Sequence, residues 1–110
     1  VVKFKIHKND TAFENYSKLL KKSSFLFKKN IRKILKNKYK LKKQNHKKGS
    51  YYNRKSVDYK KLINITKLEH NLKTHNKIRS LIFPPFQLPI YNGKKIKKSI
   101  FKNNKIHLIT

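Results

Sequence analysis

The chain has 110 residues, of which 31 are lysine or arginine and only four are acidic, so its formal net charge is +27 at pH 7. A free protein with this imbalance repels itself, and the charge therefore predicts a polyanionic partner, with nucleic acid as the first candidate. The absence of cysteine excludes disulfides and thiolate metal sites, and no run approaches the roughly 20 apolar residues of a membrane span.

The first part of the chain predicts an extended arm followed by two helices. Apolar and basic residues alternate over residues 1–6, which favours a short strand or an extended arm. Asp10 or Thr11 is expected to cap a brief first helix, and Ser23-Ser24 is expected to end it. A second, amphipathic helix follows, and its apolar stripe is expected to be core. The stripe consists of Phe27, Ile31, Ile34 and Leu35.

The middle of the chain is predicted to be irregular. Residues 36–55 contain no acid and few apolar side chains, so this run is expected to be disordered when free and to order against an anion. Tyr51-Tyr52 lies within it, and we interpret the pair as packing groups, with stacking on unpaired bases as the alternative. A further helix is predicted from residue 56 or 58 through Leu68, and residues 70–77 are predicted to be a polar connector.

The last third predicts a small sheet built around a hairpin. Asn92-Gly93 tolerates the positive φ of a type I′ turn and therefore joins two antiparallel strands. A third strand is predicted over Arg79–Phe83, and Pro84-Pro85 closes it because proline cannot continue a central ladder. The expected fold class is α+β, with a small antiparallel three-stranded sheet, one or two helices and extended basic segments. In the outgoing strand, Ile96, Lys98 and Ile100 are expected on one face, with Lys95 and Lys97 on the other.

Catalytic and metal-binding patterns are missing from the sequence. The five histidines are scattered without a second acidic ligand at metal spacing, and the four acids are isolated from one another. No carboxylate pair, glycine-rich phosphate loop or nucleophile motif is present. The sequence therefore predicts a protein that is not an enzyme and that holds no metal and no cofactor.

Three ordered pieces of the last third resemble the ribosomal protein S-nineteen family of the small subunit. They are Arg79-Ser80, Leu81-Ile82-Phe83-Pro84 and Tyr91-Asn92-Gly93-Lys94, which match the family's arginine-serine pair, its apolar pair with proline, and its turn. His107 matches a histidine that follows the family's last strand, and the segment 20–26 is similar to the entry into the family's first helix.

This resemblance implies a division of the chain. Residues 1–19 would be an N-terminal extension, residues 20–110 an rRNA-binding domain, and residues 37–72 or thereabouts a basic insertion. In the alternative, the family's helix lies at residues 57–68 and everything before it is an extension.

The function implied by the resemblance is structural. The chain would be a constituent of the head of the mitochondrial small ribosomal subunit, binding small-subunit rRNA beside the S-thirteen protein, contacting the large subunit and touching no membrane. Abundant lysine, asparagine and isoleucine are typical of an AT-rich coding sequence, which favours a mitochondrion, with a plastid as the alternative location. Other candidate functions are a basic membrane-surface protein and a nucleoid DNA-binding protein. The predicted RNA-binding residues are Lys21, Lys22, Arg79, Ser80, Asn92, Gly93, Lys94, Lys95 and His107.

Overall fold

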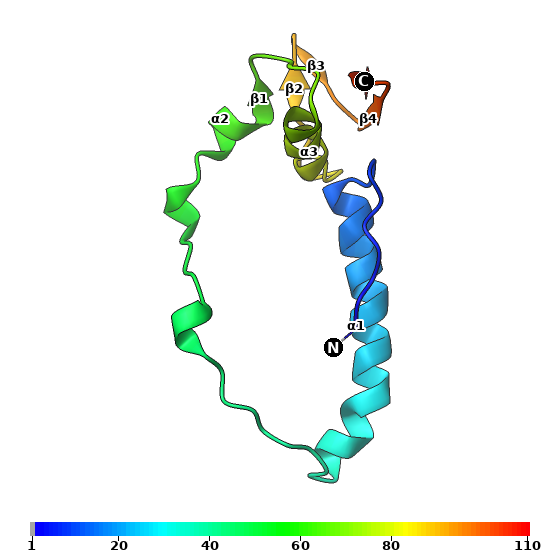
Figure 1. Ribbon diagram of the computed structural model, residues 1–110, viewed down its shortest axis with the longest axis vertical. Coiled ribbons are helices and arrows are strands. Elements are labelled where there is room, and N and C mark those ends of the chain that lie inside the picture. Colours follow the sequence, from blue (N-terminus) through cyan, green and yellow to red (C-terminus); the bar gives the residue numbers. More distant parts are fainter. Residues whose placement is uncertain (1) are drawn as a thin grey trace.

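The computed structural model describes residues 2–110 and contains a long helix, a returning arc and a small folded unit (Figure 1). The helix α1 (Ala12–Leu35) projects away from the folded unit, and the arc over residues 36–58 runs back along the other side. The principal extents are 56 × 28 × 26 Å and the radius of gyration is 18.5 Å. A compact domain of this length has a radius of gyration of about 13 Å, so much of this chain lies outside a shared core.

Helix α1 is held by motifs at both of its ends. At the start, Thr11 Oγ1 accepts from the Glu14 backbone N–H (3.3 Å), while the Glu14 carboxylate accepts from the Thr11 N–H (2.7 Å). This reciprocal capping box satisfies N–H groups that have no partner inside the helix. At the other end, Asn37 takes a positive φ of 53°, and Lys38 N–H donates to the Lys33 carbonyl (2.8 Å). Such a left-handed residue after the last turn is a common way to end a helix.

Two predictions for this region are wrong. No break occurs at Ser23-Ser24, because α1 runs through both serines for 24 residues. Serine inside a helix costs only a few tenths of a kcal/mol relative to alanine, which is too little to end a helix with a continuous apolar stripe. The stripe is also not core, since no residue of α1 is buried and Phe27 keeps 62% of its surface exposed.

The N-terminal arm forms no strand over residues 2–6, so the extended-arm alternative holds there, and Val1 lies outside the described residues. Lys18 on α1 attaches this arm, because its ammonium donates to the Lys5 carbonyl (3.2 Å) and pairs with the Asp10 carboxylate. The boundary predicted between residues 19 and 20 falls inside α1; as a division of the chain it stays a prediction.

The returning arc carries two short 3-10 turns, His46–Lys48 and Arg54–Ser56, and every residue from 32 to 56 is exposed. Asparagine caps both turns: the Asn45 side chain accepts from the Lys47 N–H (3.1 Å) and the Asn53 side chain from the Ser56 N–H (2.9 Å). The predicted disorder of this run in the free chain stays a prediction. Among residues 2–110, no helix is both long enough and apolar enough to cross a membrane.

The two remaining helices differ from the prediction. Helix α2 (Tyr59–Ile63) is capped by Asp58 and stops after five residues, because the chain then enters strand β1 (Asn64–Ile65). Helix α3 (Leu72–Ser80) occupies most of the predicted connector. The Asn71 side chain accepts from the Thr74 N–H (2.8 Å) and starts this helix.

The predicted strand over Arg79–Phe83 is wrong as well. Arg79 and Ser80 belong to the last turn of α3, since His75, Ile78 and Ile82 recur at helical spacing and all three are buried. After α3, Phe83 and Gln87 exchange both backbone hydrogen bonds at 2.8 Å. They close a tight loop whose Pro84-Pro85 peptide is cis.

The Asn92-Gly93 hairpin is confirmed. Strands β2 (Ile90–Tyr91) and β3 (Lys94–Lys95) pair antiparallel, and the turn residues have φ values of 48° and 74°. The third strand of this sheet is β1, which pairs with β2 in parallel, so the sheet is mixed rather than antiparallel.

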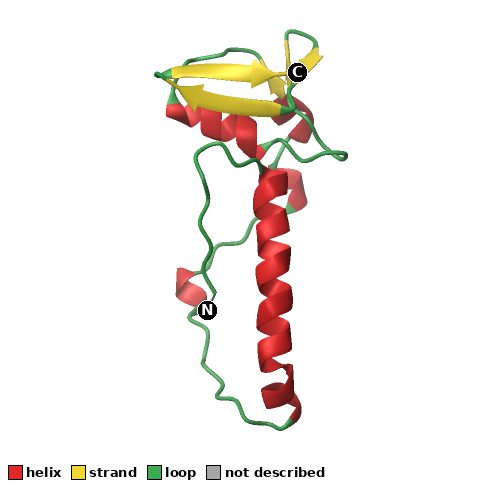
Figure 2. Ribbon diagram, turned by 90° about the vertical axis from the view of Figure 1, so that its right-hand side faces the viewer, coloured by secondary structure: helices red, strands yellow, loops and turns green. Residues whose placement is uncertain are grey.

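A second sheet follows, formed by the hairpin of β4 (Lys98–Lys102) and β5 (Lys105–Ile109), which lies across α3 (Figure 2). Its turn is Asn103-Asn104, with both φ values positive. The chain crosses between the sheets at Ile96, whose N–H donates to the Pro89 carbonyl (2.8 Å), and at Lys97, whose N–H donates to the Ile109 carbonyl (2.7 Å). The continuous outgoing strand is therefore wrong: the crossing resets the alternation, so that Ile96 and Ser99 are buried.

The core is small. It consists of Ile65, Ile78, Leu81, Ile82 and Ile96, and five partly buried side chains pack around it. The assignment to the α+β class stays a prediction.

Candidate functional site

A groove of about 330 Å³ opens between α2, the loop after α3 and the β2–β3 hairpin. Two aromatic side chains flank it and remain exposed: Tyr59 at 53% and Phe86 at 85%. Two lysines, Lys60 and Lys95, also line it. We call this the aromatic groove; its residues are Tyr59, Lys60, Ile63, Pro85, Phe86, Gln87, Leu88, Ile90 and Lys95.

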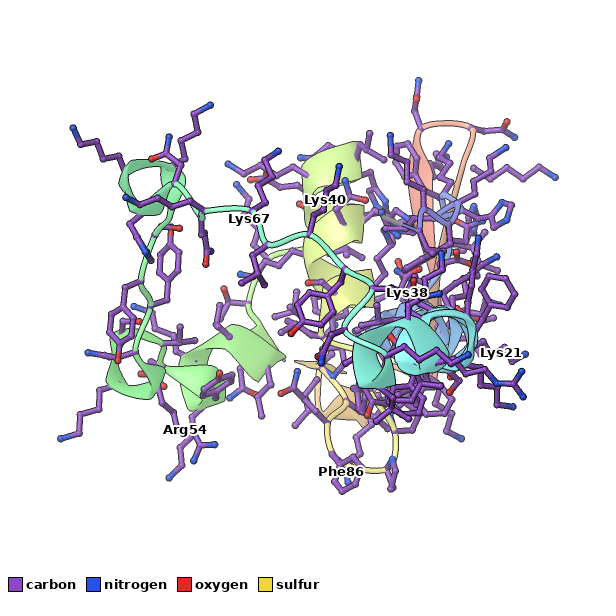
Figure 3. The ribbon with its side chains drawn as sticks, turned by 90° about the horizontal axis from the view of Figure 1, so that it is seen from below. Lys21, Lys38, Lys40, Arg54, Lys67 and Phe86 are labelled. Carbon is purple, nitrogen blue, oxygen red and sulfur yellow. The ribbon has the colours of Figure 1, made fainter. Side chains whose placement is uncertain are left out.

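Local structure holds the aromatic side of the groove in place. The Phe83–Gln87 backbone pair projects Phe86 outward at the tip of its loop, and Figure 3 shows this ring pointing away from the rest of the molecule. The Gln87 side-chain amide donates to the Leu81 carbonyl (3.0 Å) and ties the loop to the end of α3. On the inner side, the Phe83 ring contacts Phe86 with 6.2 Å between ring centroids. Phe86 does not stand alone, because Tyr59, Ile63, Pro85, Leu88 and Ile90 line the same groove. A contiguous apolar surface of this kind marks a candidate binding site.

The opposite side of the groove is set by two short elements. Asp58 caps α2, because its carboxylate accepts from the Lys61 N–H (3.1 Å), and this starts the helix at Tyr59. The hairpin turn at Asn92-Gly93 places Lys95 on β3, where it pairs with Ile90 of β2. The groove therefore combines flat aromatic surface with two cations. This pairing suits a ligand with a planar ring and a negative charge, such as a nucleotide.

The acids of the chain have structural roles. Asp58 is a helix cap, and the other three acids lie in ion pairs with lysines. Hydrogen bonds from Lys18 and then from the His7 N–H lower the pKa of Asp10. The pairs are Asp10 with Lys18, Glu14 with Lys98 at 3.9 Å, and Glu69 with Lys67 at 2.9 Å. Within residues 2–110 no group of three metal-ligand side chains is found.

The one fully buried histidine is a structural residue. His75 Nε2 lies 2.9 Å from the Lys8 carbonyl oxygen, which only accepts, so Nε2 carries the hydrogen. Nδ1 then accepts from the Ser99 hydroxyl at 2.8 Å, and the ring stacks on Phe101. Both nitrogens are occupied, and the side chain joins the arm, α3 and β4.

The residues predicted to bind RNA do not form one surface. Lys21 and Lys22 lie on α1, which projects away from the folded unit that carries the other seven (Figure 1). Arg79 and Ser80 end α3, and His107 lies exposed on β5. The four residues from Asn92 to Lys95 are adjacent, and of all nine residues only Lys95 lines the aromatic groove.

Arg79 is occupied by contacts within the chain. Its Nε donates to the Asn76 side chain (2.8 Å), and one terminal nitrogen donates to the carbonyls of Asp10 (2.9 Å) and His7 (3.3 Å). The Ser80 hydroxyl donates to the Lys77 carbonyl (2.8 Å). Arg79 therefore joins the arm to α3.

Sequence reasoning missed both aromatic residues of the groove. Tyr59 follows the Asp58 cap and Phe86 follows Pro84-Pro85, so each stands beside a signal that was recognised. Neither signal indicates that Tyr59, which precedes α3, and Phe86, which follows it, line the same groove.

Comparison with known proteins places the chain beside a class of enzymes. No protein-family model matches the chain, and no curated protein matches it significantly. Two solved structures do match. WlaRD, a sugar 3N-formyl transferase solved in the presence of dTDP and 5-N-formyl-THF, is 42% identical with a TM-score of 0.75. The N-formyltransferase from Helicobacter canadensis, in complex with folinic acid and dTDP-3-aminofucose, is 40% identical with a TM-score of 0.75. Each match covers 91% of this chain and 36% of the neighbour, so the chain spans little more than a third of these proteins' length.

These matches overturn the ribosomal interpretation. The resemblance to ribosomal protein S-nineteen is wrong, and so are the structural role in the small subunit and the membrane-surface and nucleoid alternatives. The predicted partners, namely rRNA, the S-thirteen protein and the large subunit, are wrong too. The fold shows why the resemblance was misleading. The Arg79-Ser80 pair, expected in a strand, ends α3, and of the matched pieces only the Asn92-Gly93 turn has the expected hairpin structure.

The prediction that the protein is not an enzyme is also wrong, since the neighbours are transferases. With rRNA excluded as the partner, the assignment of the nine residues to a binding site stays a prediction. The mitochondrial location stays a prediction. Over 91% of its length, the chain is similar to one segment of sugar N-formyltransferases.

Proposed function

We propose that this chain supplies a nucleotide-binding part of a sugar N-formyltransferase. The observation that carries the proposal is 42% identity and a TM-score of 0.75 over 91% of the chain to WlaRD. The neighbours were solved with dTDP, with dTDP-3-aminofucose and with formylated folates. The substrates proposed here are therefore a dTDP-linked amino sugar and a formyl-tetrahydrofolate.

The reaction moves one formyl group between two nitrogens. The formyl carbon forms a bond to the amine nitrogen of the sugar, and its bond to a tetrahydrofolate nitrogen breaks. The amine gives up a proton and the folate nitrogen gains one, so the atoms balance without an oxidant.

In this proposal the aromatic groove holds the nucleotide. Tyr59 and Phe86 offer rings for the thymine base, and stacking of a base on an aromatic side chain contributes about 1–3 kcal/mol. Lys60 and Lys95 offer ammonium groups for the diphosphate. The net charge of +27 attracts the same anion from a distance.

Proton transfer is assigned to the rest of such an enzyme. Within residues 2–110 each carboxylate is a helix cap or an ion-pair partner, and the buried His75 uses both ring nitrogens. The role of this chain is then to bind and orient the sugar nucleotide, which lowers the barrier by holding the amine in place.

The test is a chimera in which the full chain replaces the matching segment of the Helicobacter canadensis N-formyltransferase, titrated with dTDP by calorimetry. Tyr59→Ala and Phe86→Ala are each expected to weaken dTDP binding about tenfold, because each removes a stacking ring. The control is Phe25→Ala, which removes a ring about as accessible as that of Tyr59 (58% against 53% exposed) from α1, outside the groove. Equal dTDP affinity in the parent chimera and all three variants would contradict nucleotide binding in the aromatic groove.

A further inference from the structure

Helix α1 carries a continuous apolar stripe along its whole length. Phe13, Leu20, Phe27 and Ile34 recur every seven residues, which places them on one face of a helix. Lys22 and Lys29 lie on the opposite face. We call the apolar face the α1 stripe; its residues are Phe13, Tyr16, Leu20, Phe27, Ile31 and Ile34.

Most of the α1 stripe is uncovered. Only its first turns touch the folded unit, where the Phe13 and Tyr16 rings pack edge-on against Phe83 at 5.6 and 5.3 Å between centroids. Farther along, Leu20, Phe27 and Ile34 are 49%, 62% and 50% exposed. An isolated helix gains most of its stability from packing of its apolar face, so this face requires a cover.

Shallow, open depressions lie on two sides of the middle of α1. One of about 430 Å³ borders the stripe and is lined by Ser23, Leu26, Phe27, Asn30 and Ile34. The other, also of about 430 Å³, includes Phe25 and two lysines, Lys21 and Lys28. The Asn30 side-chain amide donates to the Leu26 carbonyl (2.8 Å), so its donor is satisfied inside the helix. The depression beside the stripe contains no charged side chain, whereas the one beside Phe25 contains two lysines, so the apolar row rather than the relief of the surface marks the face for packing.

The length of the neighbours indicates the cover. The matched segment is 36% of their chains, and with 91% of this chain matched, at least part of the 24-residue α1 lies inside it. The segment as a whole has a radius of gyration of 18.5 Å and a very small core. A shape of this kind belongs to part of a larger folded body.

Charge argues against a second copy as the cover. Two copies would bring together +27 each, and the stripe is bordered on one side by Lys21 and Lys28. Such a surface favours a partner with an apolar strip and acidic residues beside it.

We infer that the α1 stripe is the docking surface for the remaining part of a formyltransferase fold, the part that corresponds to the unmatched length of the neighbours. The inference rests on the proposed function for its choice of partner. Apolar side chains of that part cover Leu20, Phe27 and Ile34, and its acidic residues face Lys21 and Lys28.

The chain offers a closely matched pair of variants for the test. Phe27 lies on the stripe and is 62% exposed, whereas Phe25 lies on the other side of α1 and is 58% exposed. In the chimera, Phe27→Asp is expected to lower the melting temperature by roughly 10 °C or more, because it places a charge in a packed interface. Phe25→Asp is expected to shift it by no more than about 2 °C. If the Phe27→Asp variant is not recovered in a folded state, the melting temperature of the milder variant Phe27→Ser is measured instead. It is expected to fall by less than that of Phe27→Asp.

Thermal melting uses neither dTDP nor a formyl donor, so it separates this inference from the proposed function. A chimera that shows the Phe27–Phe25 difference but binds no dTDP contradicts the proposed function and leaves the docking surface standing. Equal losses for Phe27→Asp and Phe25→Asp would overturn the docking surface. Two results with the full chain alone would do the same. One is a dimer in sedimentation that Phe27→Asp, but not Phe25→Asp, dissociates. The other is binding to phosphatidylglycerol vesicles that depends on Phe27 and not on Phe25.

Discussion

At the scale of single residues, a few polar side chains join segments that are far apart in the sequence. Arg79 and His75 both reach the N-terminal arm, at the carbonyls of Asp10 and Lys8 respectively. Asp10 in turn pairs with Lys18, so the arm, α1 and α3 meet at one cluster. The Asp10 side chain is 15% exposed and that of Lys18 is 31% exposed, so the pair is only partly shielded from solvent.

The Asp10 pair predicts a pH dependence of stability. Hydrogen bonds from Lys18 and from the His7 N–H hold the pKa of Asp10 below its ordinary value of 3.8. A carboxyl with a lowered pKa in the folded state stabilises the fold above its unfolded pKa, and the contribution is lost as pH falls through the folded pKa. In acid denaturation of the chimera, Asp10→Asn is expected to destabilise the fold by about 1 kcal/mol near neutral pH. This difference from the parent should shrink, and then disappear, as the pH falls below 3.8 and through the lowered pKa of Asp10.

Asp58→Asn is the control for that measurement. It also removes one carboxylate, but asparagine caps α2 as well as aspartate does, so stability should match that of the parent. A loss for Asp10→Asn that persists unchanged into acid would mean that the ion pair is not its cause.

At the scale of elements, turns and caps decide where the chain changes direction. The β2–β3 hairpin depends on Gly93, whose φ of +74° is a conformation that other residues adopt with strain. A Cβ at this position would meet no atom within 4 Å, so any effect of substitution comes from the backbone alone.

The two glycines of the chain form a natural comparison. Gly93→Ala is expected to destabilise the chimera by about 1–2 kcal/mol in urea denaturation, because alanine resists positive φ. Gly49→Ala is expected to be neutral or slightly stabilising, since Gly49 has φ −86° and its added Cβ would lie 3.4 Å from the His46 carbonyl oxygen. Equal losses at both positions would show that φ is not what the hairpin requires.

Elements whose signals are local were predictable from the sequence. The Asn92-Gly93 turn, the Asp58 cap and the second half of α1 all follow from neighbouring residues. Long-range pairing was not predictable: β1 stops α2 early because Ile65 pairs with Tyr91, and the crossing at Ile96 depends on the position of β5. The Asn103-Asn104 hairpin was not predicted from the sequence. Two consecutive asparagines are nevertheless a recognisable turn signal, because asparagine tolerates the positive φ that both residues adopt here.

The candidate site was harder to predict than the fold. Lys95 was the one predicted residue that lines the groove, because the hairpin that carries it was recognised. Tyr59 and Phe86 come together only through the packing of α2 and the Pro84-Pro85 loop around the core, which no local pattern records. The order of the motifs also led to the wrong family. The Arg79-Ser80 pair lies at the end of a helix, Pro84 lies in a loop, and only Asn92-Gly93 forms a hairpin turn.

At the scale of the whole molecule, the chain is elongated and carries a large positive charge. The proposed docking surface rests on the chain's extents of 56 × 28 × 26 Å, its uncovered α1 stripe and its small core. A charge of +27 predicts an anionic partner but does not distinguish a polymer from a small diphosphate. The match to enzymes solved with dTDP favours the small ligand as the proposed partner.

The most direct measurement is formyl transfer by the chimera. Purified chimera is incubated with a dTDP-linked 3-amino sugar and formyl-tetrahydrofolate, and the N-formylated sugar nucleotide is measured by mass spectrometry. The account predicts product formation by the chimera, a kcat/KM about tenfold lower in the Phe86→Ala variant, and none in the enzyme with the matching segment deleted. A chimera that melts cooperatively, binds dTDP no better than the Phe86→Ala variant and forms no product would contradict it.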